Sequence, residues 1–342
     1  MAKRPTIAGL AAKAGVSVAT VDRVLNGRLP VRDETARRVY DAARDIGYHA
    51  TGLIRQRIER EVSQYRLGFL LQRPEQEFYK NFATAIRAAC TEEMRFRALP
   101  AVEFLDSQNP ADNAARLKDL AQRCRAVAMT SIDHPTVSAA VAEVKARGIP
   151  VFSLLSDFAS GVREGYVGLN NHKVGRSAAW IISRIAKPGK IAIFVGSGRF
   201  HGHELREIGF RSYFREYAPQ FELLDTLLNL ETPSIAYEAT LHLMHRHADL
   251  TGFYVAGGGM EGAIAALREE GARRGIVAVC NELTAESRSG LADNLVTAAI
   301  ATPLAHLSQQ LLGLMVAAIE SGPADTPGQI FLPYELFISE NI

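Results

Sequence analysis

Four residues between positions 18 and 23 have side chains suited to contacting the edges of DNA bases. The Arg23 guanidinium can donate two hydrogen bonds to O6 and N7 of guanine. Val18 and Ala19 are small and apolar, so they favour contact with a thymine methyl group. Asp22 could accept a hydrogen bond from cytosine N4 or pair with a neighbouring arginine, and we favour the pairing. This chemistry requires an element that carries these residues into the major groove.

The surrounding residues predict two short helices joined by a tight turn. Thr6 can cap a first helix that ends at Gly15, and Ser17 can cap a second helix that ends at Gly27. The apolar residues at helical spacing are Ile7, Leu10, Ala11, Ala14, Val21, Val24 and Leu25. Only two residues separate the helices, which is typical of a helix-turn-helix whose second helix enters the major groove.

A third helix, predicted at 34–46, closes a small core beside the first two. Charge is uneven along the chain. Residues 1–60 hold twelve Lys and Arg against six Asp and Glu, a net charge of +6, although the whole chain has a net charge of only +2. A basic head on a mildly acidic body suggests a polyanion partner for the head alone.

This head resembles that of the lactose/galactose repressor (LacI/GalR) family of bacterial transcription regulators. The resemblance is carried by residues 6–7, 11–17, 19–21, 23–27, 31, 34–35, 38–39 and 46–48. It implies DNA phosphates at or beside Thr6, Ser17, Thr20, Asn26 and Thr35, and bases facing Val18, Ala19 and Arg23. Tyr48, Arg55 and Arg57 are further predicted DNA contacts. Asp22 departs from the small Ser that is usual in the family.

In the family, the linker after the head is a short hinge helix that folds on operator DNA and wedges a leucine into the minor groove. The family's proline is Ala50 here, and its leucine is Arg57. An arginine enters a narrow minor groove by electrostatics but is a poor wedge between base pairs, although Ile58 could serve if the register shifts by one. We expect the hinge to order on DNA without the usual kink, and a plain flexible linker is the alternative.

Short apolar strands alternate with amphipathic helices from about residue 64 onward. Strands are predicted at 67–71, 98–104, 126–130, 151–155, 166–169, 191–195, 222–228, 252–255 and 276–280. Helices are predicted at 78–94, 113–124, 136–147, 172–185, 203–217, 234–247 and 261–270. Such strands predict parallel sheets covered on both faces, arranged as two doubly wound lobes. The predicted fold is therefore multidomain, with an all-α head and an α/β core that by resemblance is periplasmic-binding-protein-like.

Three regions follow from this pattern. We expect a helix-turn-helix domain at 1–50, a hinge at 51–63 and an effector-binding core at 64–342. Lobe 1 would span about 64–160 and 292–322, and lobe 2 about 161–291 and 323–342. The crossing of 295–321 to the first lobe, and of the tail 330–342 to the second, is implied by the resemblance.

Ligands bind doubly wound sheets outside the carboxyl ends of the strands, here in the cleft between the lobes. Phe78 and Tyr79 match the aromatic pair that sandwiches a pyranose ring in related sugar-binding proteins, and we favour such a role for one of them over two core aromatics. Asp133 and Glu282, with Asn281 beside the latter, match positions that accept hydrogen bonds from ligand hydroxyls.

Two departures from the family limit this transfer. The arginine that many relatives place on sugar oxygens is Glu204 here, and we expect Arg206 to point elsewhere on its helix. The family's Asn-Asp is replaced by glycines at 257–259, which supply no carboxylate. With Asp133, Glu204 and Glu282 converging, a polyol or an amine-bearing ligand is favoured over an acid. His203 is a further predicted ligand contact at a helix N-terminus.

Other chemistry is not indicated by the sequence. The histidines near 201–203 and 242–247 lack a carboxylate placed to complete a tetrahedral metal site. Glycines at 196 and 198 are not followed by the Lys-Ser/Thr pair of a nucleotide triphosphate site, and no nucleophile elbow occurs, so neither catalysis nor a cofactor is predicted. Three widely spaced cysteines, no membrane-length apolar run and no secretory signal fit a reducing cytoplasm.

We therefore expect a ligand-responsive transcription regulator that acts as a repressor, in preference to two alternatives: a transport-type sugar-binding protein and a doubly wound enzyme. Its partners would be double-stranded operator DNA, a sugar-like or polyol effector, and a second copy of the chain, because a homodimer reads a pseudo-palindrome through two heads. No membrane partner is expected. Ligand binding would act by shifting the population of lobe arrangements.

Overall fold

The computed structural model describes residues 5–26, 31–55, 63–270, 275–322, 324 and 326–342. Contacts divide the chain into two compact units, Met1–Tyr65 with Cys90–Leu99 and Arg66–Ala89 with Pro100–Ile342. The first unit contains the predicted head, and the second contains most of the α/β core.

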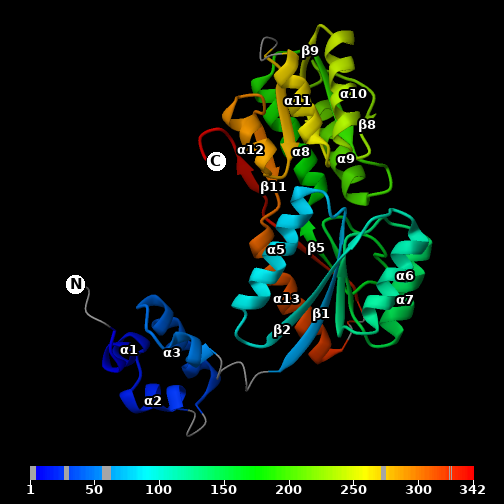
Figure 1. The fold of residues 1–342 in the computed structure, drawn as a ribbon. Coiled ribbons are helices and arrows are strands. Elements are labelled where there is room, and N and C mark those ends of the chain that lie inside the picture. Colours follow the sequence, from blue (N-terminus) through cyan, green and yellow to red (C-terminus); the bar gives the residue numbers. More distant parts are fainter. Residues whose placement is uncertain (1–4, 27–30, 56–62, 271–274, 323, 325) are drawn as a thin grey trace. The chain divides into compact units, whose positions relative to one another are not determined.

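The head consists of helices α1 (Ile7–Ala14), α2 (Val18–Asn26) and α3 (Asp33–Asp45) (Figure 1). The Thr6 hydroxyl caps α1 by accepting the Gly9 N–H at 3.1 Å. Gly15 follows α1 with a φ of 63°, a left-handed conformation that favours glycine, and it turns the chain into α2. Leu10 and Val21 are fully buried between the helices. The predicted helix-turn-helix is confirmed.

The predicted hinge is only partly described. Residues 51–55 are helical, whereas 56–62, including Arg57 and Ile58, lie outside the described residues. Ordering of this segment on DNA stays a prediction.

The first sheet of the core has the strand order β12-β5-β4-β3-β1-β2. Its strands are β1 (Gln64–Gln72), β2 (Arg97–Leu105), β3 (Ala126–Met129), β4 (Val151–Leu154), β5 (Gly165–Leu169) and β12 (Gly328–Leu332). Its helices are α5 (Glu77–Glu92), α6 (Pro110–Ala121), α7 (Pro135–Ala146) and α13 (Leu304–Ser321). In Figure 1, α6 and α7 cover one face and α5 and α13 the other. Every residue of β3 and β4 is buried, as expected of strands covered on both faces.

The second sheet has the order β13-β11-β10-β9-β6-β7, with β8 also pairing with β6. Its strands are β6 (Lys190–Val195), β7 (Glu222–Leu223), β8 (Leu227–Leu228), β9 (Leu250–Val255), β10 (Val277–Asn281), β11 (Ala298–Ala301) and β13 (Glu335–Phe337). Its helices are α8 (Asn171–Ile185), α9 (His201–Tyr217), α10 (Pro233–Arg246), α11 (Met260–Glu270) and α12 (Ala285–Ala292). The strands pair in parallel except β13, which runs antiparallel to β11.

The predicted lobe boundaries are wrong at three crossings. Strand β5 pairs in parallel with β4, so it belongs to the first sheet although it lies beyond residue 160. Strand β11 pairs with β10 in the second sheet, and the chain returns to the first lobe only with α13. Strand β12 pairs with β5, so only the end of the tail, at β13, reaches the second sheet. Local periodicity predicts a strand but does not specify its neighbours, and the family resemblance placed the crossings only approximately, which together explain these errors.

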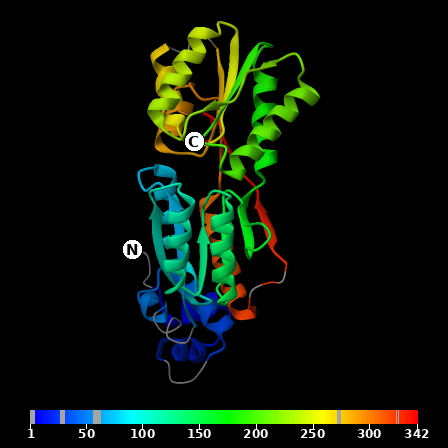
Figure 2. The ribbon, with the colours of Figure 1, turned by 90° about the vertical axis from the view of Figure 1, so that its right-hand side faces the viewer.

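The strand predicted at 222–228 is interrupted, and its two ends form β7 and β8. None of the described helices carries an apolar stretch long enough to cross a bilayer. Figure 2 shows, from the side, the crossing segments that join the two lobes of the core.

Candidate functional site

The exposed face of α2 carries the residues predicted to contact bases. Val18 is 46% exposed, and Ala19 and Arg23 are also exposed, whereas Val21 and Val24 are buried against the rest of the head. The turn before the helix is fixed by Ser17, whose side chain accepts from the Thr20 backbone and bonds to the Thr20 hydroxyl. This face can offer apolar contact and a donating guanidinium side by side.

Among the described residues, Asp22 pairs with an asparagine and not with an arginine as we expected. Its Oδ1 accepts a hydrogen bond from Asn26 Nδ2 at 2.6 Å, one helical turn along. No arginine in the described part of the chain lies within ion-pair distance of this carboxylate. The i to i+4 spacing brings Asp22 and Asn26 together, whereas Arg23 points away along the next row of the helix.

The remaining predicted DNA contacts lie in different environments. Thr6 is exposed at the start of α1, and Thr35 is half-buried in the first turn of α3. Tyr48 is only 7% exposed and lies in the core of the head, so it offers little surface for the predicted DNA contact, which stays a prediction. Its ring is more stable buried among apolar side chains than in water. Arg55 is the last described residue of the helical segment and donates to the carbonyl oxygen of Thr91, and Arg57 lies outside the described residues.

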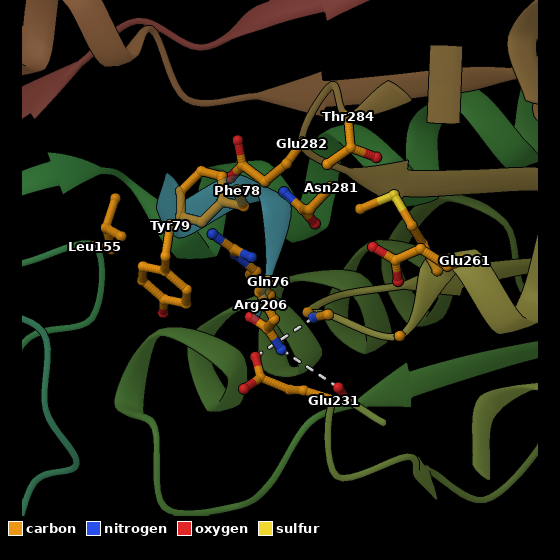
Figure 3. A pocket seen from close by; sticks show the side chains of 14 residues that line it. Gln76, Phe78, Tyr79, Leu155, Arg206, Glu231, Glu261, Asn281, Glu282 and Thr284 are labelled. Atoms are coloured by element: carbon orange, nitrogen blue, oxygen red, sulfur yellow. Dashed lines mark hydrogen bonds between the residues drawn. The ribbon is translucent and has the colours of Figure 1, made fainter. Parts of the chain in front are cut away.

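A cleft lies at the carboxyl ends of β1, β9 and β10 (Figure 3). Its lining residues are Gln76, Phe78, Tyr79, Leu155, Arg206, Glu231, Gly257, Gly258, Gly259, Met260, Glu261, Asn281, Glu282 and Thr284. About 80 Å³ is open to the centres of water molecules, which at roughly 10–15 Å³ per water holds about half a dozen waters. The cleft therefore has room for one compact metabolite.

Four of the predicted ligand residues line this cleft: Phe78, Tyr79, Asn281 and Glu282. The rings of Phe78 and Tyr79 meet edge to face, with centroids 5.1 Å apart and planes at 73°. They therefore do not form two parallel plates around a sugar ring. Phe78 is half-buried and Tyr79 is 8% exposed, and burial raises the pKa of the Tyr79 hydroxyl.

The prediction that Arg206 points away from the cleft is wrong. Arg206 lies on the inward face of α9, 7% exposed, whereas the side chain of Glu204 is 57% exposed and pairs with His201 instead. Arg206 Nε donates to Asn171 Oδ1 at 2.7 Å, and its Nη1 donates to the Ala256 carbonyl oxygen at 2.7 Å. The guanidinium is thus fixed at the wall of the cleft. Glu204 plays no part in the lining.

Asp133 and His203 do not line the cleft either. Asp133 is exposed, and its Oδ1 accepts from the Ala159 N–H at 3.1 Å. His203 lies behind the cleft wall, with Nε2 3.6 Å from Glu231 Oε1 and with Nδ1 lacking a partner among the described residues. Burial first, and then the charge of Arg206, lowers the pKa of His203 to about 3, so its ring is neutral at ordinary pH.

Glu231 is the main lining residue that the sequence did not reveal. It lies in the loop after β8, 8% exposed, and burial raises the pKa of its carboxyl despite the opposing effect of Arg73. Glycines make room for it: a Cβ at Gly196 would lie 2.3 Å from Glu231 Cγ, and one at Gly258 would lie 3.1 Å from its Cβ. The glycines at 257–259 thus supply no carboxylate themselves but accommodate the one on Glu231.

Asn281 and Glu282 end β10 in fixed orientations. Asn281 is 1% exposed, accepts from the Tyr254 hydroxyl and donates to the Ile300 carbonyl oxygen. Both oxygens of Glu282 accept from Thr302, one from the backbone and one from the hydroxyl, each at 2.8 Å. Burial raises the pKa of the Glu282 carboxyl. Thr302 lies where the chain leaves β11 for the other lobe, so Glu282 joins the cleft to a crossing segment.

The described residues contain no cluster of three His, Cys, Asp or Glu side chains that could hold a metal ion. The lining combines one guanidinium, two amides, carboxylates and aromatic faces. Such a set can hold a polar ring or chain of hydroxyls by donors and acceptors while an apolar face covers its C–H groups.

Residues 67–323 match the model of the periplasmic binding protein domain. The chain belongs to this family. Its head, residues 6–51, matches the model of bacterial regulatory proteins of the lacI family. The core of this family member is similar to an ABC transporter periplasmic solute binding protein from Actinobacillus succinogenes 130z with bound D-allose, with a TM-score of 0.73 and 16% identity over 81% of this chain and 98% of that one.

Two further proteins are similar to this chain. A solute binding protein from Agrobacterium vitis, bound with alpha-D-tagatopyranose, has a TM-score of 0.73 and 18% identity over 81% of this chain and 95% of that one. The HTH-type transcriptional regulator GntR from Pseudomonas aeruginosa is 27% identical over 226 residues, 65% of this chain. The match spans 62% of the length of that regulator. The lacI-family head and the binding-protein core thus occur together in one chain.

Proposed function

We propose that this chain is a ligand-responsive DNA-binding transcription regulator. The observation that carries the proposal is the coexistence of an exposed recognition face on α2, bearing Arg23, with a separate cleft for a small molecule. A head alone would bind DNA without a signal, and a core alone would suit a transport binding protein. One chain with both can relate occupancy of the cleft to DNA binding. The chain would act where the chromosome lies, in the cytoplasm.

The proposed regulator binds a pseudo-palindromic operator as a homodimer, because each helix-turn-helix head reads one half-site. The DNA contacts are proposed for Ser17, Val18, Ala19, Thr20, Arg23 and Asn26 on the exposed surface around α2. We infer repression as the outcome of operator binding. Catalysis is not part of the proposal.

The proposed effector is a sugar-like or polyol metabolite. Relatives of the core have D-allose or alpha-D-tagatopyranose bound, and the cleft of this chain offers room for one compact molecule. Arg206 can donate to ligand oxygens, and Glu231 can accept from hydroxyls. The carboxylates of Glu231, Glu261 and Glu282 outnumber Arg206 in the lining, which also supports an amine-bearing sugar over an acid.

The direct test is DNA binding by the full-length protein, measured by fluorescence anisotropy with DNA from its own upstream region. The logarithm of the affinity is expected to fall linearly with the logarithm of the salt concentration. Arg23→Ala should weaken binding by about 5- to 150-fold, because one bidentate guanine contact contributes about 1–3 kcal/mol. Arg44→Ala is the matched control, since Arg44 is exposed on α3 and lies 3.9 Å from Asp41. Binding that is unchanged in Arg23→Ala, or insensitive to salt, would contradict the proposal.

A further inference from the structure

Two carboxylates in the cleft, those of buried Glu231 and half-buried Glu282, differ in how well their oxygens are bonded. Glu282 accepts two bonds of 2.8 Å from Thr302. Glu231 has longer contacts only: its Oε1 is 3.4 Å from the Gly258 N–H nitrogen and 3.6 Å from His203 Nε2, and its Oε2 is 3.6 Å from Arg73 Nε. A buried carboxylate without short hydrogen bonds is costly, so Glu231 is the one with capacity to accept a donor from a bound molecule.

Glu231 also lies at a contact between the two lobes of the core. The strand β8 before it belongs to the second sheet, whereas Arg73 and Gln76 follow β1 of the first sheet. Arg73 Nη2 donates to the Leu230 carbonyl oxygen at 3.0 Å. Gln76 Nε2 donates to the Glu231 carbonyl oxygen at 3.3 Å (Figure 3). Side chains of one lobe thus hold both the backbone and the carboxylate of the loop from the other.

The loop that carries Glu231 is fixed within its own lobe. Asn229 is fully buried, donates to the Gly258 carbonyl oxygen at 2.8 Å and accepts from the Glu231 N–H at 2.9 Å. Leu230 and Glu231 both have a positive φ, 49° and 54°, which is unfavourable for residues with a side chain. Such strain persists only where the surroundings hold it, and it is often found at ligand sites.

We propose that Glu231 couples ligand binding to closure of the lobes: its carboxylate accepts a hydroxyl or ammonium donor of the bound metabolite and at the same time holds Arg73 of the opposite lobe. This inference rests on the proposed function, because it assigns a sensing residue to that cleft. The ligand group bound by Glu231 is a hydrogen-bond donor, and the Arg73–Glu231 interaction is the one through which its binding changes the arrangement of the lobes.

The coupling arises because the Glu231 carboxylate takes part in two interactions, one with the ligand donor and one with Arg73. Opening of the lobes would separate Arg73 from Glu231 and break the ion pair that this carboxylate makes across the lobes. A ligand donor that makes Glu231 more favourable in the closed arrangement shifts the population toward that arrangement. By linkage, a lobe contact that favours closure raises ligand affinity in turn. Glu282, whose oxygens are bonded within its own surroundings, has no such link to Arg73.

The first test measures lobe separation in the full-length protein by the distance between two spin labels. Labels at Ala139→Cys on α7 and Glu238→Cys on α10 report on the two lobes, and the native Cys90, Cys124 and Cys280 are buried. Distances are measured without sugar and with saturating D-allose, D-fucose or D-glucosamine. The variants are then compared with the parent in the condition that gives the parent its shortest mean distance.

Arg73→Met and Glu231→Gln are each expected to lengthen the mean distance, and the double variant should lengthen it no further, because both changes remove one interaction. Lys190→Met is the matched control, since its ion pair with Asp249 lies within the second lobe. Unchanged distances in either single variant, or shifts that add in the double variant, would overturn the coupling.

The second test measures affinity for the probe sugar that raises the parental melting temperature most. Glu231→Gln is expected to weaken binding by about tenfold, because a charged acceptor is replaced by a neutral one. Glu282→Gln should weaken it less. A larger loss in Glu282→Gln, or no binding of any of the three sugars to the parent, would overturn the assignment of Glu231 as the acceptor.

The two proposals fail in different ways. A parent that binds no DNA contradicts the regulator, yet the label distances still judge the coupling of Arg73 and Glu231. A parent that binds DNA, with unchanged distances in the variants, contradicts only the coupling.

Discussion

The head and the cleft differ in how far apart in the sequence their working residues lie. The recognition face of α2 is formed by residues within one helix of nine residues. The cleft takes Gln76, Arg206, Glu231 and Asn281 from four places in the chain: the loop after β1, helix α9, the loop after β8 and the end of β10. A helix fixes the spacing of its side chains by its own geometry, whereas the cleft depends on how the strands are ordered. A substitution in the head should therefore have a local effect, and one in the cleft should affect both lobes.

The largest effect that would sharpen this comparison is expected for Arg206→Met. It removes the guanidinium from the cleft and leaves Asn171 Oδ1 and the Ala256 carbonyl oxygen without their donor. Affinity for the effector should fall by at least about 100-fold, and the free energy of unfolding by about 2–4 kcal/mol. Calorimetric titration and denaturation of the full-length protein measure the two effects, and DNA binding without effector should be unchanged.

Glu204→Gln is the matched control for Arg206→Met, because it lies on the same helix with an exposed side chain. It should leave effector affinity within about twofold of the parent. If Glu204→Gln weakened binding more than Arg206→Met, the orientation of α9 toward the cleft would be wrong.

The fold could be predicted from the sequence to the level of elements and class, and less well to the level of strand neighbours. Thr6, Gly15 and Ser17 mark helix ends by local hydrogen bonds and backbone conformation, so the head was predicted closely. Strands β5 and β12 were placed in the wrong lobe, because an apolar strand fits either sheet and pairing is decided by distant residues. Periodicity contains no information on that choice.

The candidate site was predicted where it lies directly after a strand. Phe78 comes after the end of β1, and Asn281 and Glu282 lie at the end of β10, where a sheet directs its loops toward ligands. Glu231 lies in a polar loop with no periodicity. The glycines that make room for its side chain are distant in the sequence and become its neighbours only in the folded structure. Arg206 was missed because counting along a helix from the wrong reference residue changes the face.

A smaller effect is expected from pH on the free energy of unfolding. It would test whether His203, behind the cleft wall, is shielded from water. The pKa of His203 is lowered to about 3 in the folded chain, against about 6.5 in the unfolded chain. Between these values the unfolded state binds one more proton at this residue, so the free energy of unfolding falls as pH decreases, by up to about 1.4 kcal/mol per pH unit. Denaturation of the parent and of His203→Gln from pH 7 to pH 4 measures this contribution as the difference in slope.

Comparison with the variant is needed because Glu231 and Glu282 act in the opposite direction. Their pKa values are raised, so the folded state takes up protons before the unfolded state as pH falls. His201→Gln is the control for loss of a histidine ring from the same helix, because that ring is exposed at the start of α9. Equal slopes in the parent and in His203→Gln would mean that the ring is protonated within the folded chain.

The smallest effect is expected in the head, from Asp22→Ser. An ionised carboxylate accepts hydrogen bonds only, so in the major groove it favours the amino group of cytosine or adenine and disfavours the acceptor edges of guanine and thymine. Asn26 occupies Oδ1 and thereby orients the other oxygen, Oδ2. The variant should lose about fivefold of preference at one base position, and keep the guanine preference that Arg23 confers, because a single hydrogen bond contributes about 1 kcal/mol. Selection of bound DNA from a randomised half-site library measures this.

Asp41→Ser on α3 is the control for removal of one negative charge, which strengthens binding to all sequences alike. An unchanged base preference in Asp22→Ser would mean that the Asp22–Asn26 pair only stabilises α2. The residues that read bases would then be fewer than the exposed face of this helix offers.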